Sequence, residues 1–280
     1  MSITEQGQRG PDTTPHLGCR AGMIGRIRRL RTAVADLTRS GCDLLFPPRC
    51  VYCGEELADP PTDWRLCADC LDKFAVANWH GCNRCGGAVI DNSAASDGCE
   101  SCRHIRLCFD AVIPLGGYHA GLRDAVLRMK RPAHDALSAA MGALLLETRR
   151  ERLAAVRADI IVPIPMFWRR RLGRGKNSPE LLARCLAKSL RVPLRPILVR
   201  HRNTLPQAGL APRRRFENVR GAFRVRRPDA VEGARVLLVD DVLTTGATCS
   251  EAAHVLKQAG AATVVVAVVA RADAAAHDRS

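Results

Sequence analysis

The chain lacks a hydrophobic run long enough to cross a lipid bilayer. Its most apolar stretch, residues 261–270, is half as long as the roughly 20 residues that a membrane-spanning helix needs. Residues 1–15 mix acids, glycine and proline and contain no apolar core of the kind that marks a secretory signal peptide. These absences argue against a transmembrane segment and against export, and they predict a cytoplasmic protein.

Aromatic side chains are also scarce, at 4% of the 280 residues. Proteins that bind single-stranded nucleic acid usually stack bases on aromatic side chains, so this shortage counts weakly against that function. Positive charge and cysteine are in excess, with 43 Lys+Arg against 28 Asp+Glu and with 13 cysteines. The net charge of +15 is compatible with a nucleic-acid partner, and equally with a codon bias that favours arginine.

Residues 1–45 are predicted to form a mobile N-terminus followed by a short basic helix. From residue 24, apolar side chains recur at three- and four-residue spacing with arginines between them, as in an amphipathic helix. These apolar positions are Ile24, Ile27, Leu30, Val34 and Leu37. Packing of this helix on its own protein is the favoured interpretation, and binding to anionic lipid or DNA is the alternative.

Residues 46–108 contain a doubled cysteine motif. Eight of the thirteen cysteines form four CxxC pairs, which are Cys50/Cys53, Cys67/Cys70, Cys82/Cys85 and Cys99/Cys102. Thirteen residues separate the first pair from the second, and thirteen separate the third from the fourth. Two residues between cysteines let both sulfur atoms of a tight turn face one tetrahedral ion, which is typical of structural zinc sites.

A segment of about sixty residues with so few apolar side chains buries too little surface to fold unaided, so bound metal has to supply folding free energy. We therefore predict a small double zinc ribbon over residues 46–108, with two structural zinc ions each held by four cysteines. The repeat favours sequential ligation, in which the first two pairs hold one ion and the last two hold the other. An iron–sulfur cluster or a redox dithiol is the competing interpretation.

Residues 109–280 alternate between predicted strands and helices. Strands are expected at residues 111–115, 159–162, 235–239 and 263–269, and helices at residues 122–129, 135–156, 178–190 and 249–258. Continuous apolar strands separated by helices are typical of a mostly parallel sheet that is covered on both faces. Between Arg200 and Arg227 the periodicity is lost, and nine arginines stand against a single acid, Glu217. This composition predicts a mobile basic loop.

The segment from Arg235 to Thr248 carries the most specific chemistry. Two adjacent carboxylates, Asp240 and Asp241, lie at the end of a predicted buried strand. Open α/β sheets bind ligands at this carboxyl edge. A loop of small and hydroxyl-bearing residues then runs into a helix, where backbone N–H groups and the helix dipole suit a phosphate. Carboxylates just before such a phosphate-binding loop could accept hydrogen bonds from the vicinal hydroxyls of a ribose. A strand end followed by an ordinary helix cap is the simpler alternative.

The Asp240 to Thr248 segment resembles the signature with which type I phosphoribosyltransferases bind phosphoribosyl pyrophosphate (PRPP). The resemblance implies that Asp240 and Asp241 hold the ribose and that the following loop holds its 5′-phosphate. The loop residues are Thr244, Thr245, Gly246, Ala247 and Thr248. Magnesium would sit between pyrophosphate and ribose oxygens. The implied fold is α/β, a type I phosphoribosyltransferase-like parallel sheet with a small N-terminal double zinc-ribbon domain.

Other segments are candidates for binding the same ligand. Val162-Pro163-Ile164-Pro165 ends a strand in a rigid turn, and a cation cluster follows it at Arg169, Arg170, Arg171, Arg174 and Lys176. Pro163, Ile164 and Arg174 are predicted ligand-binding residues. In the basic loop, Arg202, Arg213, Arg214 and Arg215 are predicted to stabilise the departing pyrophosphate and to exclude water. The alternative for each arginine is an ordinary solvated surface position.

The whole chain resembles the ComF family of competence-related proteins over about residues 44–270. The likeness is carried by Leu44 to Pro47, Tyr118, Gly121, Leu122, Arg123, Lys130, Val162 to Pro165, Arg202, Thr204, Gln207, Asn218, Gly221, Ala222, Phe223 and Asp240 to Thr248. Where the family usually reads Arg-Gly-Phe-Asn-Gln, this sequence reads Arg174-Gly175-Lys176-Asn177-Ser178. The resemblance implies a PRPP-like ligand, a bacterial cytosolic setting, and a link to uptake or processing of single-stranded DNA.

These residues are compatible with two functions. In the first, the protein is an enzyme that transfers a 5-phosphoribosyl group with magnesium. In the second, it is a non-catalytic DNA-handling factor whose zinc ribbons and basic loops contact DNA or a helicase. The fold alone does not decide between them.

Overall fold

The computed structural model of the chain describes residues 47–57, 64–76, 79–89, 98–167, 177–205 and 210–272. The chain divides into two compact units, Met1–Pro48 and Arg49–Ser280. The predicted N-terminal helix and the cation cluster at residues 169–176 lie outside the described residues. The second unit contains both the cysteine module and the alternating strands and helices.

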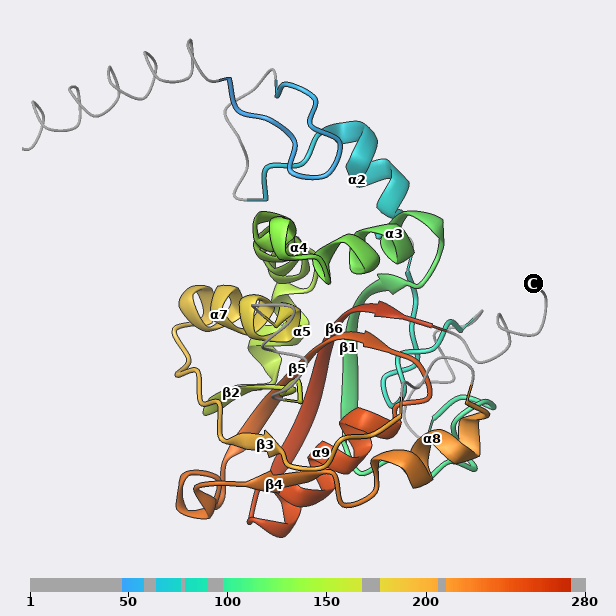
Figure 1. The fold of residues 1–280 in the computed structure, drawn as a ribbon, viewed down its shortest axis with the longest axis vertical. Helices are drawn as coiled ribbons and strands as arrows, with labels where there is room; N and C mark the ends of the chain where they lie inside the picture. The colour runs from blue at the N-terminus through green and yellow to red at the C-terminus, as the bar shows by residue number, and fades with distance from the viewer. Residues whose placement is uncertain are drawn as a thin grey trace, which may run out of the picture. The chain divides into compact units, whose positions relative to one another are not determined.

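Four parallel strands form the central sheet, in the order β1-β6-β5-β2 (Figure 1). They are β1 (Ala111–Gly117), β2 (Ile160–Pro163), β5 (Arg235–Leu243) and β6 (Thr263–Arg271). The predicted parallel sheet is confirmed, and its apolar strands are buried on both faces. Because β5 runs to Leu243, past its predicted end at Val239, Asp240 and Asp241 lie within the strand.

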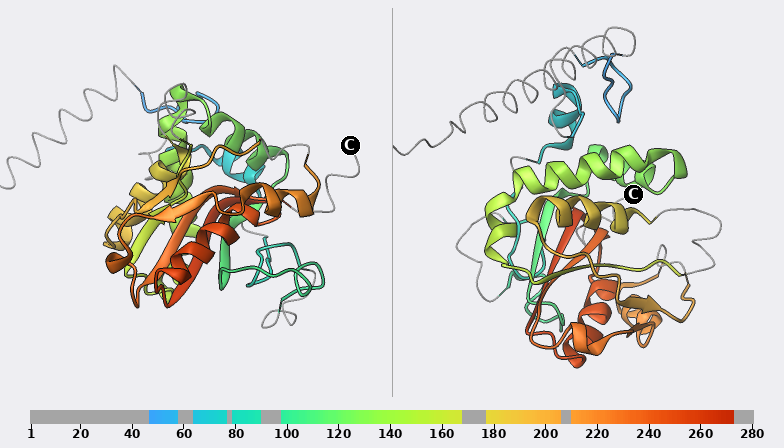
Figure 2. Two further views of the ribbon diagram at one scale, coloured as in Figure 1. Left: turned by 60° about the horizontal axis from the view of Figure 1, so that its bottom comes forward. Right: turned by 90° about the vertical axis from the view of Figure 1, so that its left-hand side faces the viewer.

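Helices cover one face of the sheet, while one helix and a two-stranded ribbon cover the other (Figure 2). The first face carries α3 (Ala120–Met129), α4 (Asp135–Thr148), α5 (Arg150–Ala155) and α7 (Ser178–Leu190). The second face carries α9 (Ala247–Gln258) and the antiparallel pair β3 (Leu198–Arg200) and β4 (Phe223–Val225). Short 3-10 turns lie at Pro132–His134 and Pro228–Ala230.

Alternate residues of β5 divide between the two hydrophobic cores. Leu237 and Val239 belong to the core under α4 and α7, whereas Val236 and Leu238 belong to the core under α9. Side chains of a strand alternate between faces, so the pattern sends the two neighbouring aspartates to opposite sides of the sheet.

The single helix predicted over residues 135–156 is wrong, because the chain leaves helical geometry at Arg149 (φ −119°, ψ 23°) and forms α4 and α5 instead. The Arg149 guanidinium donates to the carbonyl oxygens of Val76 (3.1 Å), Pro114 (3.1 Å) and Leu115 (2.9 Å). Burial lowers the pKa of this guanidinium. These bonds to a distant segment set the break, and helical periodicity contains no sign of them.

The basic segment after β3, predicted as a loop from its composition, contains a helix among its described residues. Residues Pro212–Val219 form helix α8, which begins with a proline in its first turn as helices favour. The Arg202 guanidinium donates to the carbonyl oxygens of Asn218 and Arg220 at the end of α8. The Asn218 side chain exchanges hydrogen bonds with the Leu205 backbone, at 3.0 and 3.1 Å. These contacts join α8 to Arg202 and Leu205.

The first half of the cysteine module packs on α3. Its helix α2 (Ala68–Phe74) approaches α3 so closely that a side chain at Gly121 would lie 2.1 Å from the Lys73 carbonyl oxygen. The Tyr52 hydroxyl donates to Asp124 at 2.7 Å, and Arg128 donates to the Tyr52 carbonyl at 2.9 Å. Through the described ranges, no helix combines the length and the apolarity needed to cross a bilayer.

Candidate functional site

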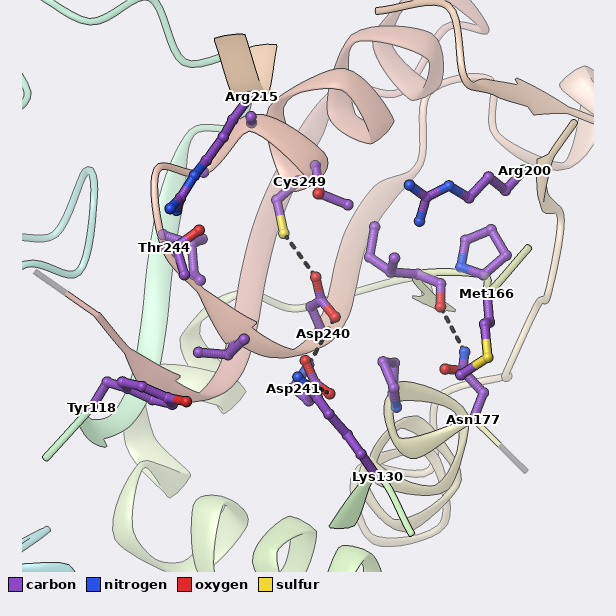
Figure 3. Close-up of a pocket in the computed structure, with 18 of the residues that line it drawn as sticks. Tyr118, Lys130, Met166, Asn177, Arg200, Arg215, Asp240, Asp241, Thr244 and Cys249 are labelled. Carbon is purple, nitrogen blue, oxygen red and sulfur yellow. Dashed lines mark hydrogen bonds and ion pairs between the residues drawn. The ribbon is translucent and has the colours of Figure 1, made fainter. Parts of the chain in front are cut away.

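The carboxyl edge of β5 opens onto a cavity of about 440 Å³ (Figure 3). Acidic side chains from β5, cations from three other segments and the loop before α9 converge on it. Its polar and charged lining residues are Tyr118, Lys130, Asn177, Arg200, Arg215, Asp240, Asp241, Thr244, Thr248 and Cys249. This is the edge at which the parallel sheet was predicted to bind a ligand.

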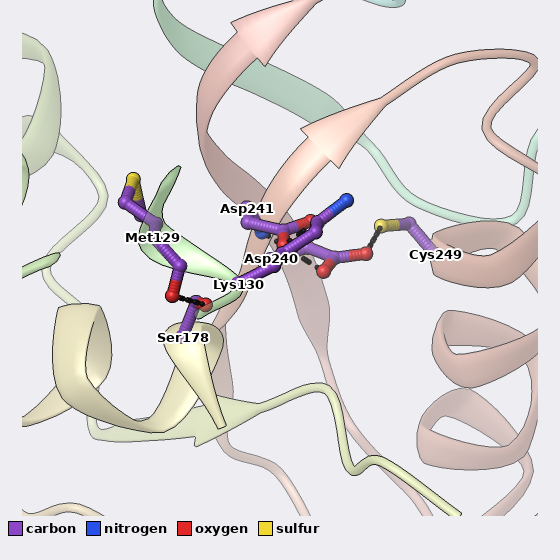
Figure 4. A network of polar contacts seen from close by, with 6 residues as sticks. All are labelled: Met129, Lys130, Ser178, Asp240, Asp241 and Cys249. Atoms are coloured by element: carbon purple, nitrogen blue, oxygen red, sulfur yellow. Dashed lines mark hydrogen bonds and ion pairs between the residues drawn. The ribbon is translucent and has the colours of Figure 1, made fainter. Parts of the chain in front are cut away.

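Asp240 is the buried member of the carboxylate pair, with 9% of its surface exposed. Its carboxylate accepts a hydrogen bond from the Asp241 backbone N–H at 2.9 Å and one from the Cys249 thiol of α9 at 3.6 Å (Figure 4). Burial, together with the neighbouring charge of Asp241, raises the pKa of Asp240 to about 7. Asp240 therefore changes its protonation state near neutral pH.

Asp241 faces the other side of the strand and pairs with Lys130, whose Nζ lies 3.5 Å from its carboxylate (Figure 4). Lys130 directly follows α3. The preceding carbonyl, that of Met129, accepts a hydrogen bond from the Ser178 hydroxyl at the start of α7. Asn177 holds the N-cap position of α7, and the Ser178 hydroxyl, one residue later, binds the end of α3.

The loop after β5 leads into α9 through Gly246, which lies at the helix N-cap with φ +80°. A side chain would be strained in this left-handed conformation, so glycine is required. Four of the five predicted phosphate-binding residues, Thr244, Gly246, Ala247 and Thr248, line the cavity. Thr245 is not among the lining residues, and its hydroxyl accepts from the Ala247 N–H at 3.4 Å.

Of the four predicted catalytic arginines, Arg215 alone lines the cavity, and its Nε donates to the Leu210 carbonyl at 2.9 Å. Arg213 and Arg214 are exposed on α8, and Arg202 binds backbone carbonyls as described above. Ile164 lines the cavity, and its carbonyl accepts from the Asn177 side chain at 2.8 Å. Pro163 lines an adjoining cavity of about 500 Å³, and Arg174 lies outside the described residues.

The sequence predicted no role in the site for several residues that the fold brings to it. Arg200 and Tyr118 line the cavity, Lys130 pairs with Asp241, and the Cys249 thiol contacts Asp240. Cys249 lies eight positions after Asp241, in the first turn of the predicted helix, and that spacing is the one signal that pointed to it.

The eight paired cysteines form two tetrads, and the sulfur atoms of each tetrad lie within 4.8 Å of one another. The tetrads are Cys50, Cys53, Cys67, Cys70 and Cys82, Cys85, Cys99, Cys102, so the predicted sequential pairing is confirmed. Four thiols at this separation fit one tetrahedral zinc ion. The described residues thus offer two complete sets of soft ligands, which would close the coordination sphere of a structural metal.

The two tetrads repeat the same backbone support. The Cys67 N–H donates to the Cys50 sulfur at 3.4 Å, and the Cys99 N–H donates to the Cys82 sulfur at 3.3 Å. Burial opposes ionisation of Cys50, but the N–H groups around it outweigh burial and lower its pKa to about 6. In the same way the pKa of Cys82 falls to about 7. Each tetrad therefore contains one sulfur prepared to bind metal as a thiolate.

Comparison with known proteins agrees with both halves of this architecture. The double zinc ribbon domain matches residues 41–105, and the phosphoribosyl transferase domain matches residues 180–280. The DNA utilization protein YhgH of Salmonella typhimurium is 32% identical over 219 residues, which span 72% of this chain and 94% of that protein. Competence protein F of Haemophilus influenzae is 27% identical, over 81% of this chain and 98% of that one. The chain belongs to the ComF family.

The family extends to Competence protein ComFC of Bacillus subtilis, which is 26% identical over 80% of this chain and 90% of its own length. Among solved structures, the glutamine PRPP amidotransferase of B. subtilis matches 42% of this ComF-family chain with 24% identity. Its TM-score of 0.28 is too low to carry an argument. The fold assignment rests on the domain match and on the parallel sheet.

Purified ComF-family protein of this sequence is expected to contain two zinc ions per chain, because each sulfur tetrad fits one ion. Elemental analysis by mass spectrometry measures this directly. Replacing one tetrad ligand, Cys85→Ser, should reduce the content to about one ion, whereas the control Cys249→Ser should leave two. A single zinc per wild-type chain, or iron in place of zinc, contradicts the double-ribbon interpretation.

The raised pKa of Asp240 predicts that its ionisation destabilises the fold. The unfolded carboxyl ionises near pH 3.8 and the folded one near 7, so stability falls as pH rises through this window and the loss is complete above it. Asp240→Asn should therefore raise the melting temperature relative to wild type at pH 8 and do so progressively less toward pH 4.

Asp159 provides a control of opposite sign. Three hydrogen bonds from Arg235 lower the pKa of Asp159 to about 2, so its carboxylate stabilises the fold above pH 3.8 and this contribution is lost as pH falls toward 2. Asp159→Asn should lower the melting temperature at pH 8. A lower melting temperature for Asp240→Asn at that pH would mean that Asp240 is not buried as described.

Proposed function

We propose that this ComF-family protein binds PRPP together with Mg²⁺ in the cavity at the carboxyl edge of β5. The observation that carries the proposal is the arrangement of Asp240 and Asp241 directly beside the glycine-led start of α9. One side of such a cavity accepts hydrogen bonds, and the other donates them. A ribose 5-phosphate unit requires this polarity, because its hydroxyls donate and its phosphate accepts.

The carboxylates would bind the vicinal hydroxyls of the ribose. The Asp241 carboxylate points toward Lys130 and the Asp240 carboxylate toward Cys249. The two acceptors therefore lie on different sides of the end of β5. Ionised Asp240 is the stronger acceptor, and its pKa near 7 makes that form dominant only above neutral pH. Ribose binding should therefore tighten as pH rises through 7.

The start of α9 would bind the 5′-phosphate. The first N–H groups of an α-helix have no partner within the helix, and the helix dipole places partial positive charge beside them. Thr248 lies in the first turn of α9, and Thr244 lies in the loop just before the helix. Gly246 adopts the left-handed conformation with which the loop enters α9, and Thr244 before it and Ala247 after it line the cavity.

Three cations surround the remaining space. Lys130, Arg200 and Arg215 reach the cavity from the end of α3, from β3 and from α8. They would attract the pyrophosphate group and hold it as the bond to the ribose carbon weakens. When bound, Mg²⁺ would neutralise pyrophosphate charge while coordinated by oxygens of the ligand, as is usual for this ion. Transfer of the phosphoribosyl group to an acceptor is the activity that this arrangement would support.

Calorimetric titration of the protein with PRPP and Mg²⁺ tests the binding proposal. Wild-type protein should release or absorb heat on binding, and Asp240→Asn combined with Asp241→Asn should abolish the signal because both ribose acceptors are lost. Asp159→Asn, at the opposite end of β5, is the matched control and should bind like wild type. Equal affinity in the double variant would remove the ribose assignment. Release of pyrophosphate when nucleobases are added would extend the proposal from binding to transfer.

DNA binding is a second candidate function, favoured by exposed arginines and by the names of the relatives. The exposed arginines lie on α8, on β4 and in the residues that follow each, at Arg213, Arg214, Arg220, Arg224, Arg226 and Arg227. The relatives are named for DNA utilization and competence. A backbone of phosphates would satisfy these arginines, with a helicase or single-stranded DNA as the partner to test.

Binding of a fluorescent oligonucleotide at several salt concentrations tests this second function. Single-stranded DNA should bind with a steep loss of affinity in salt, because bound arginines release counterions. Arg213→Gln combined with Arg214→Gln should flatten the log–log slope by about 1.4, or roughly 0.7 per lost phosphate contact. An interaction that is insensitive to salt, or no interaction, would leave the charge as a compositional bias.

A further inference from the structure

Arg271, the last residue of β6, is a buried cation placed between the second cysteine tetrad and the loop that leads to α9. Only 8% of its surface is exposed. Its Nε donates to the Cys85 carbonyl at 2.7 Å, and its Nη1 donates to the Thr244 carbonyl at 2.6 Å. Nη1 also donates to the Leu243 carbonyl at 3.4 Å and to the carbonyl of the next residue, Ala272. One guanidinium thus joins a metal-ligand residue to the proposed phosphate loop.

The charge of Arg271 has no carboxylate to balance it within the described part of the chain, where none of the ion pairs includes this residue. A buried guanidinium is costly unless a negative charge lies nearby. Four cysteine thiolates around one divalent ion carry a net charge of −2, that is 4 × (−1) + 2. The second tetrad, whose ligand Cys85 Arg271 contacts directly, would supply the missing negative charge.

Other contacts show that this half of the module lies against the loop and α9. The Cys108 backbone N–H donates to the Ser250 hydroxyl of α9 at 3.0 Å. Leu107 and Phe109 pack at Gly246, where an added side chain would meet them at 3.3 and 3.4 Å. The first tetrad has no comparable contact among those described, since its half of the module packs on α3 through Tyr52.

We propose that Arg271 is a positioning residue that balances the charge of the second metal centre and orients the phosphate loop, so that metal occupancy and phosphate affinity are coupled. The loop part rests on the function proposed above. The Thr244 carbonyl points toward Arg271, so its partly negative oxygen points away from an anionic ligand in the cavity. The Thr245 N–H of the same peptide points the opposite way, because a trans peptide directs its carbonyl and its N–H apart. Loss of the guanidinium would release this peptide and leave the tetrathiolate charge unbalanced.

The test uses the full chain with both metals bound and ribose 5-phosphate as the probe, measured by calorimetry. Arg271→Gln should weaken binding of the probe by about tenfold or more, the scale reported for residues that support metal ligands. Arg271→Lys keeps the charge but not the fork that reaches both carbonyls, so it should recover part of the affinity. The matched control is Arg84→Gln. Arg84 donates to the carbonyls of Cys102 and Ile105 at 2.9 Å in the same half of the module, and neither bond reaches the loop.

Two readouts need no ligand. Backbone amide exchange over residues 243–249 should accelerate in Arg271→Gln and stay unchanged in Arg84→Gln. Release of one of the two metal ions to a chelator should also be faster in Arg271→Gln. If Arg271→Gln does not fold, Arg271→Lys carries the same comparisons.

The outcomes separate this inference from the proposed function. Wild-type protein that fails to bind ribose 5-phosphate contradicts the proposed function, while the exchange and metal-release measurements still decide the role of Arg271. Unchanged exchange and unchanged metal release in Arg271→Gln would overturn the inference, as would probe affinity equal to that of wild type. Equal effects in Arg84→Gln would also overturn it, because the effect would then be general loosening of the module.

Discussion

Two carboxylates side by side at the end of a buried strand are the constraint on which the rest of the site depends. Burying Asp240 without a directly paired cation is unfavourable, and the neighbouring charge of Asp241 adds to the cost. The surrounding elements reduce that cost from different directions. α9 presents the Cys249 thiol, and the end of α3 brings Lys130 to Asp241. Both carboxylates line the cavity at the carboxyl edge of the sheet.

The cysteine module contributes to this arrangement at both of its ends. Its first half holds α3 through Tyr52 and Asp124, and α3 is the helix that positions Lys130. Its second half contacts the loop before α9, since Leu107 packs at Gly246 and the Cys85 carbonyl accepts from Arg271 of β6, which also donates to the Thr244 carbonyl. Both halves of the module therefore contact elements that surround the cavity, and the module and the sheet belong to one compact unit, Arg49–Ser280.

How much of this could be predicted depends on the range of the interactions involved. The apolar runs predicted the four strands of the central sheet but not β3 and β4, and the CxxC spacing predicted both tetrads, because these features arise from neighbours in sequence. The break at Arg149 and the pairing of Lys130 with Asp241 depend on segments far apart in the chain, which periodicity cannot reveal. The helix α8 was missed because its eight residues contain four charges and few apolar positions, so tertiary hydrogen bonds from Arg202 decide its structure.

The excess of arginine has a structural explanation as well as a functional one. Arg149, Arg152 and Arg271 donate to carbonyl oxygens inside the protein, and Arg152 also donates to the Asn83 side chain at 3.1 Å. A planar guanidinium with five donors joins several carbonyls at once, which a lysine ammonium does less well. Arg271 is buried and Arg149 and Arg152 are partly buried, so these three cations count toward the net charge of +15 but contribute little to an exposed basic surface. What a nucleic acid would meet is the local set of exposed arginines on α8 and β4, whereas Arg200 and Arg215 are directed to the cavity.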